Sequence, residues 1–182
     1  MNSIGLKPRP SSPHGEKFRL EALLLVAFIA TSARGAGNPR GKVTARVGRA
    51  TVTIEYGRPS VRGRNVLNLI APGQLWRLGV DAPTTIQSDV ALEVGGKAVP
   101  KGKHILLVRY IEPGIWSLVV SKQPAGQYDP ASRIAEVLTH FESRPTLTEQ
   151  VTIQIDNRHN PESIDITWGR YLLIAPFSSD SP

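Results

Sequence analysis

The chain contains no cysteine among its 182 residues, and this absence excludes several kinds of chemistry. Without thiols there can be no disulfide, no thiolate nucleophile and no zinc site built on cysteine ligands. Long segments with apolar residues at every third or fourth position are also scarce, which argues against a helical fold. Stability must therefore come from an apolar core, and the chain is long enough to bury one within a single domain.

Motifs of catalysis and metal binding are missing as well. Beyond residue 36 the histidines are His104, His140 and His159, and none has a second histidine two or four positions away. No HExxH, GxSxG or paired acidic motif occurs. We therefore predict no catalytic residue, no metal site and no cofactor.

Acidic residues are nearly absent from residues 37–77, where eight basic side chains accompany the single acid Glu55. Residues 78–182 hold nine basic and twelve acidic side chains, so the positive charge is concentrated in the first segment. Such asymmetry attracts anions. The alternative interpretation is that these arginines only solvate one end of the domain.

A leader is predicted over residues 1–36. Lys17 and Arg19 precede nine apolar residues, Ala22 to Ala30, and small residues follow from Thr31. This order is typical of a secretory signal, with cleavage expected between Ser32 and Ala36. The apolar run is too short to span a bilayer, which needs about 20 residues. We expect an exported protein, periplasmic or extracellular, without a stable membrane span in its mature form and without a nucleic-acid partner.

Residues 37–182 predict one all-β domain, because apolar and polar residues alternate in many short segments. Turn signals such as Gly48-Arg49 and Gly95-Gly96 separate them. About nine or ten strands at this spacing favour a single antiparallel β-sandwich or a barrel-like domain. The expected strands are Lys42–Val47, Ala50–Tyr56, Thr84–Ser88, Val90–Val94, His104–Ile111, Ile115–Ser121, Glu149–Asp156, Ser163–Trp168 and Tyr171–Ile174, with a short extended piece at Leu75–Val80. The apolar spacing of Ile134–Phe141 fits a short helix slightly better, but its place between strand pairs favours an extended element.

Two blocks of motifs stand out in residues 43–177. The first comprises Tyr56-Gly57-Arg58-Pro59, Gly63-Arg64, Leu75-Trp76-Arg77-Leu78-Gly79, Thr84-Thr85-Ile86 and Asp89-Val90; the second comprises Trp116, Gly126-Gln127-Tyr128-Asp129 and Thr167-Trp168-Gly169. Together they resemble the DUF2911 family of uncharacterised, mostly exported bacterial proteins. The resemblance spans residues 43–177. It implies an all-β domain outside the cytoplasm and no particular activity.

The candidate ligand-binding residues all belong to the irregular stretch after the second strand. A carboxylate or phosphate could be bound by Arg58, Arg64 and Arg77, because guanidinium groups bind planar anions through two donors. Tyr56 and Trp76 could form an aromatic platform, and Asp81 could pair with an arginine. The alternative is structural: the arginines bond backbone carbonyls of a long loop, and the aromatic rings are core anchors.

Three hypotheses for function follow from these residues. The first is a non-enzymatic exported domain that binds an anionic or carbohydrate ligand, or an envelope component, through this loop. The second is a hydrolase with an unrecognised site that uses Asp81, His104 or Glu55. The third is a purely structural envelope protein.

Overall fold

A computed structural model describes residues 38–179, and the leader predicted over residues 1–36 lies outside them. The fold is all-β, as predicted. Helix in the described part is limited to three short 3-10 turns, η1 (Val66–Leu69), η2 (Ala125–Gln127) and η3 (Pro130–Ser132). Within this part, no helix is both long enough and apolar enough to cross a bilayer.

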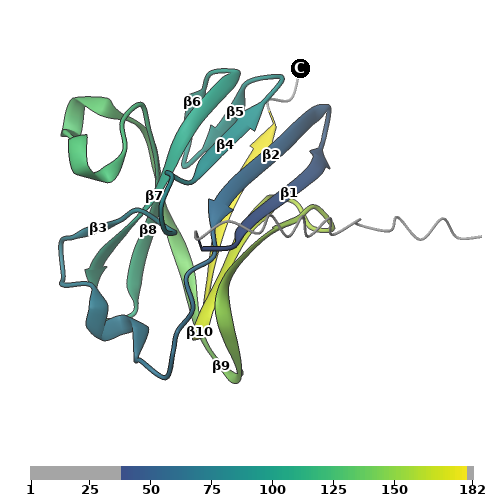
Figure 1. Ribbon diagram of the computed structural model, residues 1–182. Helices are drawn as coiled ribbons and strands as arrows, with labels where there is room; N and C mark the ends of the chain where they lie inside the picture. Colours follow the sequence, from purple (N-terminus) through teal and green to yellow (C-terminus); the bar gives the residue numbers. More distant parts are fainter. Residues whose placement is uncertain (1–37, 180–182) are drawn as a thin grey trace, which may run out of the picture.

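Ten strands form one antiparallel sheet with the order β1-β2-β4-β7-β8-β9-β10-β5-β6, and β3 pairs with β7 (Figure 1). This number agrees with the predicted nine or ten, and the sheet is not closed into a barrel. The strands are β1 (Arg40–Val47), β2 (Ala50–Gly57), β3 (Leu75–Trp76), β4 (Thr85–Ser88), β5 (Leu92–Val94), β6 (Lys97–Val99), β7 (Gly102–Glu112), β8 (Ile115–Ser121), β9 (Arg133–Asp156) and β10 (Glu162–Ser179).

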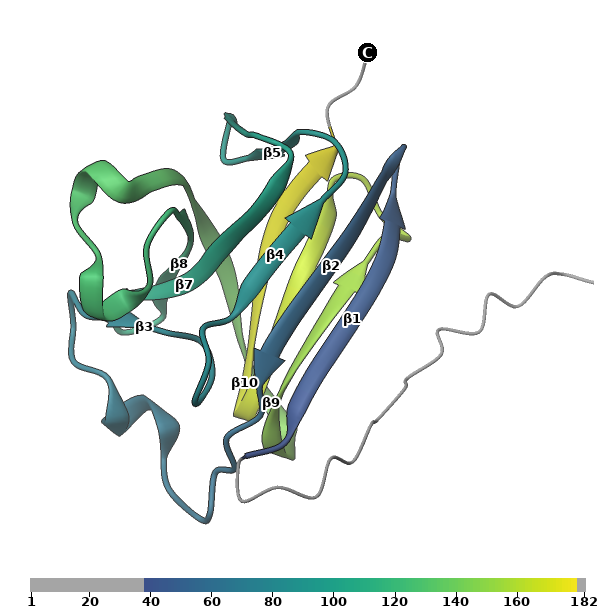
Figure 2. The same cartoon turned by 45° about the horizontal axis from the view of Figure 1, so that its top comes forward.

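The two last strands are long and bent, and they turn the single sheet into two layers (Figure 2). β9 pairs with β8 through its first part, Arg133 to Thr139, and its later part forms its ladder with β10. The sequence predicts four short strands in this region; the structure joins them in pairs into β9 and β10. The polar residues near Pro145 are exposed, and β9 continues through them.

The core lies between the two layers and follows the predicted alternation. In β2, Val52, Ile54 and Tyr56 are buried, while Thr53 and Glu55 remain partly exposed. β8 is buried on both faces, as its nearly unbroken apolar sequence predicts.

The stretch between β2 and β4, residues 58–84, is called the crossing below. Its first residues connect the two layers. Ser60 forms an isolated antiparallel bridge with Gln150 of β9. The N–H of Val61 donates to the carbonyl of Glu149 (2.7 Å), and the N–H of Val151 donates to that of Pro59 (3.1 Å). The crossing therefore ties the β1–β2 end of the sheet to β9, where no full ladder forms.

Candidate functional site

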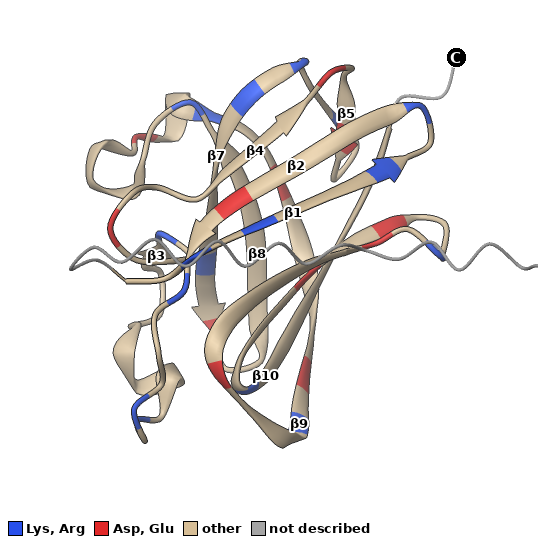
Figure 3. Ribbon diagram, turned by 45° about the vertical axis from the view of Figure 1, so that its right-hand side comes forward, with Lys and Arg blue, Asp and Glu red and all other residues tan. Residues whose placement is uncertain are grey.

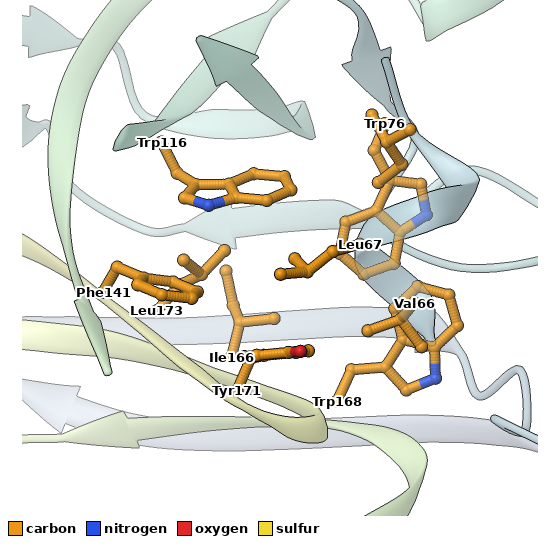
Figure 4. A pocket seen from close by; sticks show the side chains of 10 residues that line it. Val66, Leu67, Trp76, Trp116, Phe141, Ile166, Trp168, Tyr171 and Leu173 are labelled. Atoms are coloured by element: carbon orange, nitrogen blue, oxygen red, sulfur yellow. The ribbon is translucent and has the colours of Figure 1, made fainter. Parts of the chain in front are cut away.

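An apolar cleft lies between the crossing and the inner face of β8, β9 and β10 (Figure 4). A water-sized molecule has about 30 Å³ of free space in it, and the figure rises to about 350 Å³ only when the open solvent at its mouth is counted. All three tryptophans of the chain line it. We call it the tryptophan cleft, and its walls are Val66, Leu67, Ile70, Trp76, Trp116, Phe141, Ile166, Trp168, Tyr171 and Leu173.

An irregularity at Gly169 turns both halves of β10 toward the cleft. Successive side chains of a strand alternate between faces, so Ile166 and Trp168 share one face, and Tyr171 would normally share the other. The pairing register with β9 shifts on each side of Gly169, which has φ +64°. The left-handed backbone of Gly169 interrupts the alternation of β10, so Tyr171 and Leu173 also line the cleft.

The crossing supplies the opposite wall. The side chain of Asn65 caps η1 by accepting a hydrogen bond from the N–H of Leu67 (3.1 Å), which fixes the turn that carries Val66 and Leu67. The short strand β3 pairs Trp76 with Val108 of β7 and so holds the indole at the rim.

The aromatic rings of the cleft are stacked in pairs. The ring centroids of Trp76 and Trp168 lie 4.9 Å apart with their planes 13° from parallel. Phe141 and Tyr171 stack at 5.6 Å. Behind the wall, Tyr110 stacks on Trp116 at 4.3 Å. Rings at these distances contact one another, so each pair forms a rigid wall with no space between its two members.

No carboxylate, imidazole, ammonium or guanidinium group lines the cleft. Its polar groups are indole N–H groups and the hydroxyl of Tyr171. The Nε1 atoms of Trp116 and Trp168 are buried and have no hydrogen-bond partner in the described part of the chain. Such a surface can bind and orient an apolar compound, but it offers no general acid, base or nucleophile.

The six predicted site residues do not form one site. Trp76 lines the tryptophan cleft. Tyr56 is 1% exposed and lies between the layers, where its hydroxyl donates to the carbonyl of Ile153 (3.4 Å) and accepts from the N–H of Ile153 (3.0 Å). Tyr56 therefore connects β2 to β9.

Two of the predicted arginines bind protein oxygens. Arg58 donates from Nε to the carbonyl of Val151 (3.2 Å) and from Nη2 to the hydroxyl of Thr152 (3.4 Å). Arg64 turns back on its own loop and donates to the carbonyls of Val61 (3.1 Å) and Ser60 (3.2 Å). These contacts match the structural interpretation of both residues.

Arg77 and Asp81 lie further along the crossing, and both are exposed. Arg77 makes no hydrogen bond or ion pair with any of residues 38–179. Asp81 does not pair with an arginine in this range; its carboxylate accepts from the backbone N–H of Asn38 (3.1 Å). The Lys and Arg positions are also spread along the ribbon in Figure 3, where they occur on the β1–β2 hairpin, on β7 and in the crossing.

The residues of the hydrolase hypothesis also lie apart. Glu55 pairs in register with Thr85, which pairs with Ile105, whereas His104 is opposite Ile86. Since neighbouring register positions point to opposite faces, Glu55 and His104 are on different faces of the sheet. Glu55 forms ion pairs with two lysines, and the ring of His104 contacts the carbonyl of Pro100 (2.7 Å). Among residues 38–179, no group of three or more potential metal ligands occurs.

A family model described as "Protein of unknown function (DUF2911)" matches residues 38–177. The chain belongs to the DUF2911 family. No curated protein and no solved structure matches it. The predicted family is thus confirmed over the whole described domain.

The first DUF2911 motif is explained by backbone packing. A Cβ built on Gly57 would lie 2.1 Å from the carbonyl oxygen of Val80, and one on Gly79 would lie 3.1 Å from that of Gly57. The two glycines allow the end of β2 and the end of the crossing to meet at backbone distance.

The second DUF2911 motif holds the loop that covers the outer face of β8. Arg109 donates to the hydroxyl of Tyr128 (3.1 Å) and to Glu136 (2.9 Å), and Ser117 also donates to Glu136 (2.6 Å). Partial burial acts to raise the pKa of Glu136, but the hydrogen bonds from Ser117 and Arg109 outweigh it and lower the pKa below its ordinary value. Asp129 caps η3. These residues are satisfied by one another, which indicates a structural role.

Sequence reasoning missed four aromatic walls of the cleft, Trp116, Phe141, Trp168 and Tyr171. A signal was present for two of them, since Trp116 and Trp168 stand in the second block of family motifs. What could not be read from the sequence is that residues some 50 positions apart converge on one cleft.

Proposed function

We propose that this DUF2911 domain is a non-enzymatic binding domain whose tryptophan cleft takes a small ligand with a flat apolar body. The observation that carries the proposal is the convergence of all three tryptophans on one cleft without a charged group in its walls. Burial of a flat ring between such walls releases apolar surface from water on both faces.

The cleft favours an apolar ligand over a carbohydrate. Aromatic rings can stack on a sugar, but each buried sugar hydroxyl also needs a hydrogen-bond partner. The walls offer few: Tyr171 has its hydroxyl 3.5 Å from Asn65, and the remaining donors are indole N–H groups. A carbohydrate or an envelope component remains an alternative that the binding experiment decides.

An acidic group on the ligand would be recognised outside the cleft, at Arg77 of the crossing. Arg77 follows Trp76 in the chain, is exposed, and meets no acceptor among residues 38–179. Arg58 and Arg64 already donate to protein oxygens. The predicted preference for anions therefore depends chiefly on Arg77.

Binding is tested with two probes of the same frame, neutral N-phenyl-1-naphthylamine and its sulfonated analogue 1-anilinonaphthalene-8-sulfonate. Both emit more strongly in apolar surroundings, and energy transfer from tryptophan reports occupation of the cleft. We expect saturable binding of the neutral probe, and we expect Trp76→Ala to weaken it about tenfold by removing one wall.

Leu69→Ala is the matched control, because Leu69 belongs to η1 and is 46% exposed but does not line the cleft. Equal affinities of wild type, Trp76→Ala and Leu69→Ala, or no binding, would contradict the proposal. Displacement by cellobiose would favour a carbohydrate. A loss in Arg77→Gln confined to the sulfonated probe would show that Arg77 recognises the anion.

We also propose that the domain acts outside the cytoplasm, on the basis of the signal-like order of residues 17–36. The mature protein from its native host should lack about the first 32–36 residues. N-terminal sequencing or intact mass of exported material measures this. A mature protein that retains Met1 would contradict the proposal.

A further inference from the structure

The indole N–H of Trp116 is a buried donor without an acceptor. Trp116 is 3% exposed, and its Nε1 has no hydrogen-bond partner in the described part of the chain. Burial of an N–H group away from any acceptor is unfavourable, and such groups are rare in folded proteins.

The ring of Trp116 is held in one orientation. Its outer side stacks on Tyr110, and its backbone carbonyl accepts a hydrogen bond from the hydroxyl of Thr139 (3.2 Å). Figure 4 shows the nitrogen of Trp116 on the side of the ring that faces the cleft, whereas the nitrogen of Trp168 faces away from it. The two unpartnered donors are therefore not equivalent, because only the N–H of Trp116 is directed into the cleft.

The nearby walls cannot satisfy this donor. Around the interior of the cleft, Leu67, Phe141, Ile166 and Leu173 present only carbon atoms. An acceptor must come from whatever occupies the space. A charged carboxylate would be a poor choice, because one neutral N–H does not compensate for its loss of water in apolar surroundings.

We propose that the tryptophan cleft is specific for flat apolar compounds with a neutral carbonyl oxygen beside the ring, and that Trp116 Nε1–H is the group that recognises this oxygen. The inference rests on the proposed function. It names the chemical class of the ligand and makes Trp116 the residue that determines specificity.

The test uses acetophenone and α-methylstyrene, which have the same planar shape but carry C=O and C=CH₂ at the same place. Three tryptophans give three indole N–H signals in a ¹H–¹⁵N NMR spectrum, assigned by Trp→Phe variants. We expect acetophenone to bind about tenfold more tightly, the effect of one hydrogen bond to a buried donor. It should also shift the Trp116 signal downfield, and α-methylstyrene should not.

Trp116→Phe should abolish the preference between the two probes, while Trp168→Phe should retain it because that N–H faces away. Equal affinities of wild type for both probes, with N-phenyl-1-naphthylamine still bound, would overturn this inference and leave the proposed function intact. Failure of wild type to bind all three probes would overturn both. Because the probe pair is compared on wild type, the result does not depend on the stability of a variant.

Discussion

Replacement of Gly57 by alanine should lower the free energy of unfolding by about 3 kcal/mol, the upper part of the usual range for overpacking. The added Cβ would lie 2.1 Å from the carbonyl oxygen and 2.8 Å from the nitrogen of Val80. These are backbone atoms, so no side chain can rotate away to relieve the clash. Either β2 or the crossing must move.

Gly126→Ala is the matched control, since a Cβ there meets no atom within 4 Å and its φ is not in the left-handed region. It should be neutral or stabilise by about 0.5 kcal/mol, because alanine restricts the unfolded chain. Urea unfolding followed by tryptophan fluorescence measures both variants. Equal stabilities would show that the backbone contact at Val80 is not close in solution.

Tyr56→Phe should lower the free energy of unfolding by about 2 kcal/mol, although it removes a single oxygen. That oxygen donates to the carbonyl of Ile153 and accepts from its N–H, and all three groups are buried. After the substitution, a backbone donor and a backbone acceptor of β9 remain in the core without a partner.

Tyr171→Phe provides the comparison, because its hydroxyl makes only a 3.5 Å contact with Asn65 near the surface. We expect Tyr171→Phe to lower the free energy of unfolding by less than about 0.5 kcal/mol. The same urea titration applies. A Tyr56→Phe variant as stable as Tyr171→Phe would mean that water or a relaxed backbone replaces the lost hydrogen bonds.

Local patterns predicted much of the fold. The alternation of apolar and polar residues predicts β2. Gly95-Gly96 predicts the hairpin turn, and both glycines have positive φ in the structure. These features depend on a few neighbouring residues, so the sequence contains the information needed to predict them.

Features that depend on residues far apart in the chain could not be predicted from the sequence. The bend that keeps β9 continuous passes through exposed polar residues that resemble a loop when read alone. Tyr56 was placed in a candidate site because nothing local reveals its partner Ile153, 97 positions away. Arg58 and Arg64 likewise donate to backbone carbonyls. Every residue has a backbone carbonyl, so the sequence does not show which of them an arginine contacts.

The crossing has two tasks at once, because residues 59–61 join β9 while η1 and Trp76 cover the tryptophan cleft. A displacement of Leu67 away from the cleft would also strain Val61, whose N–H donates a hydrogen bond to the carbonyl of Glu149. The outer wall of the cleft and the contact that joins the two layers therefore belong to one continuous segment of chain.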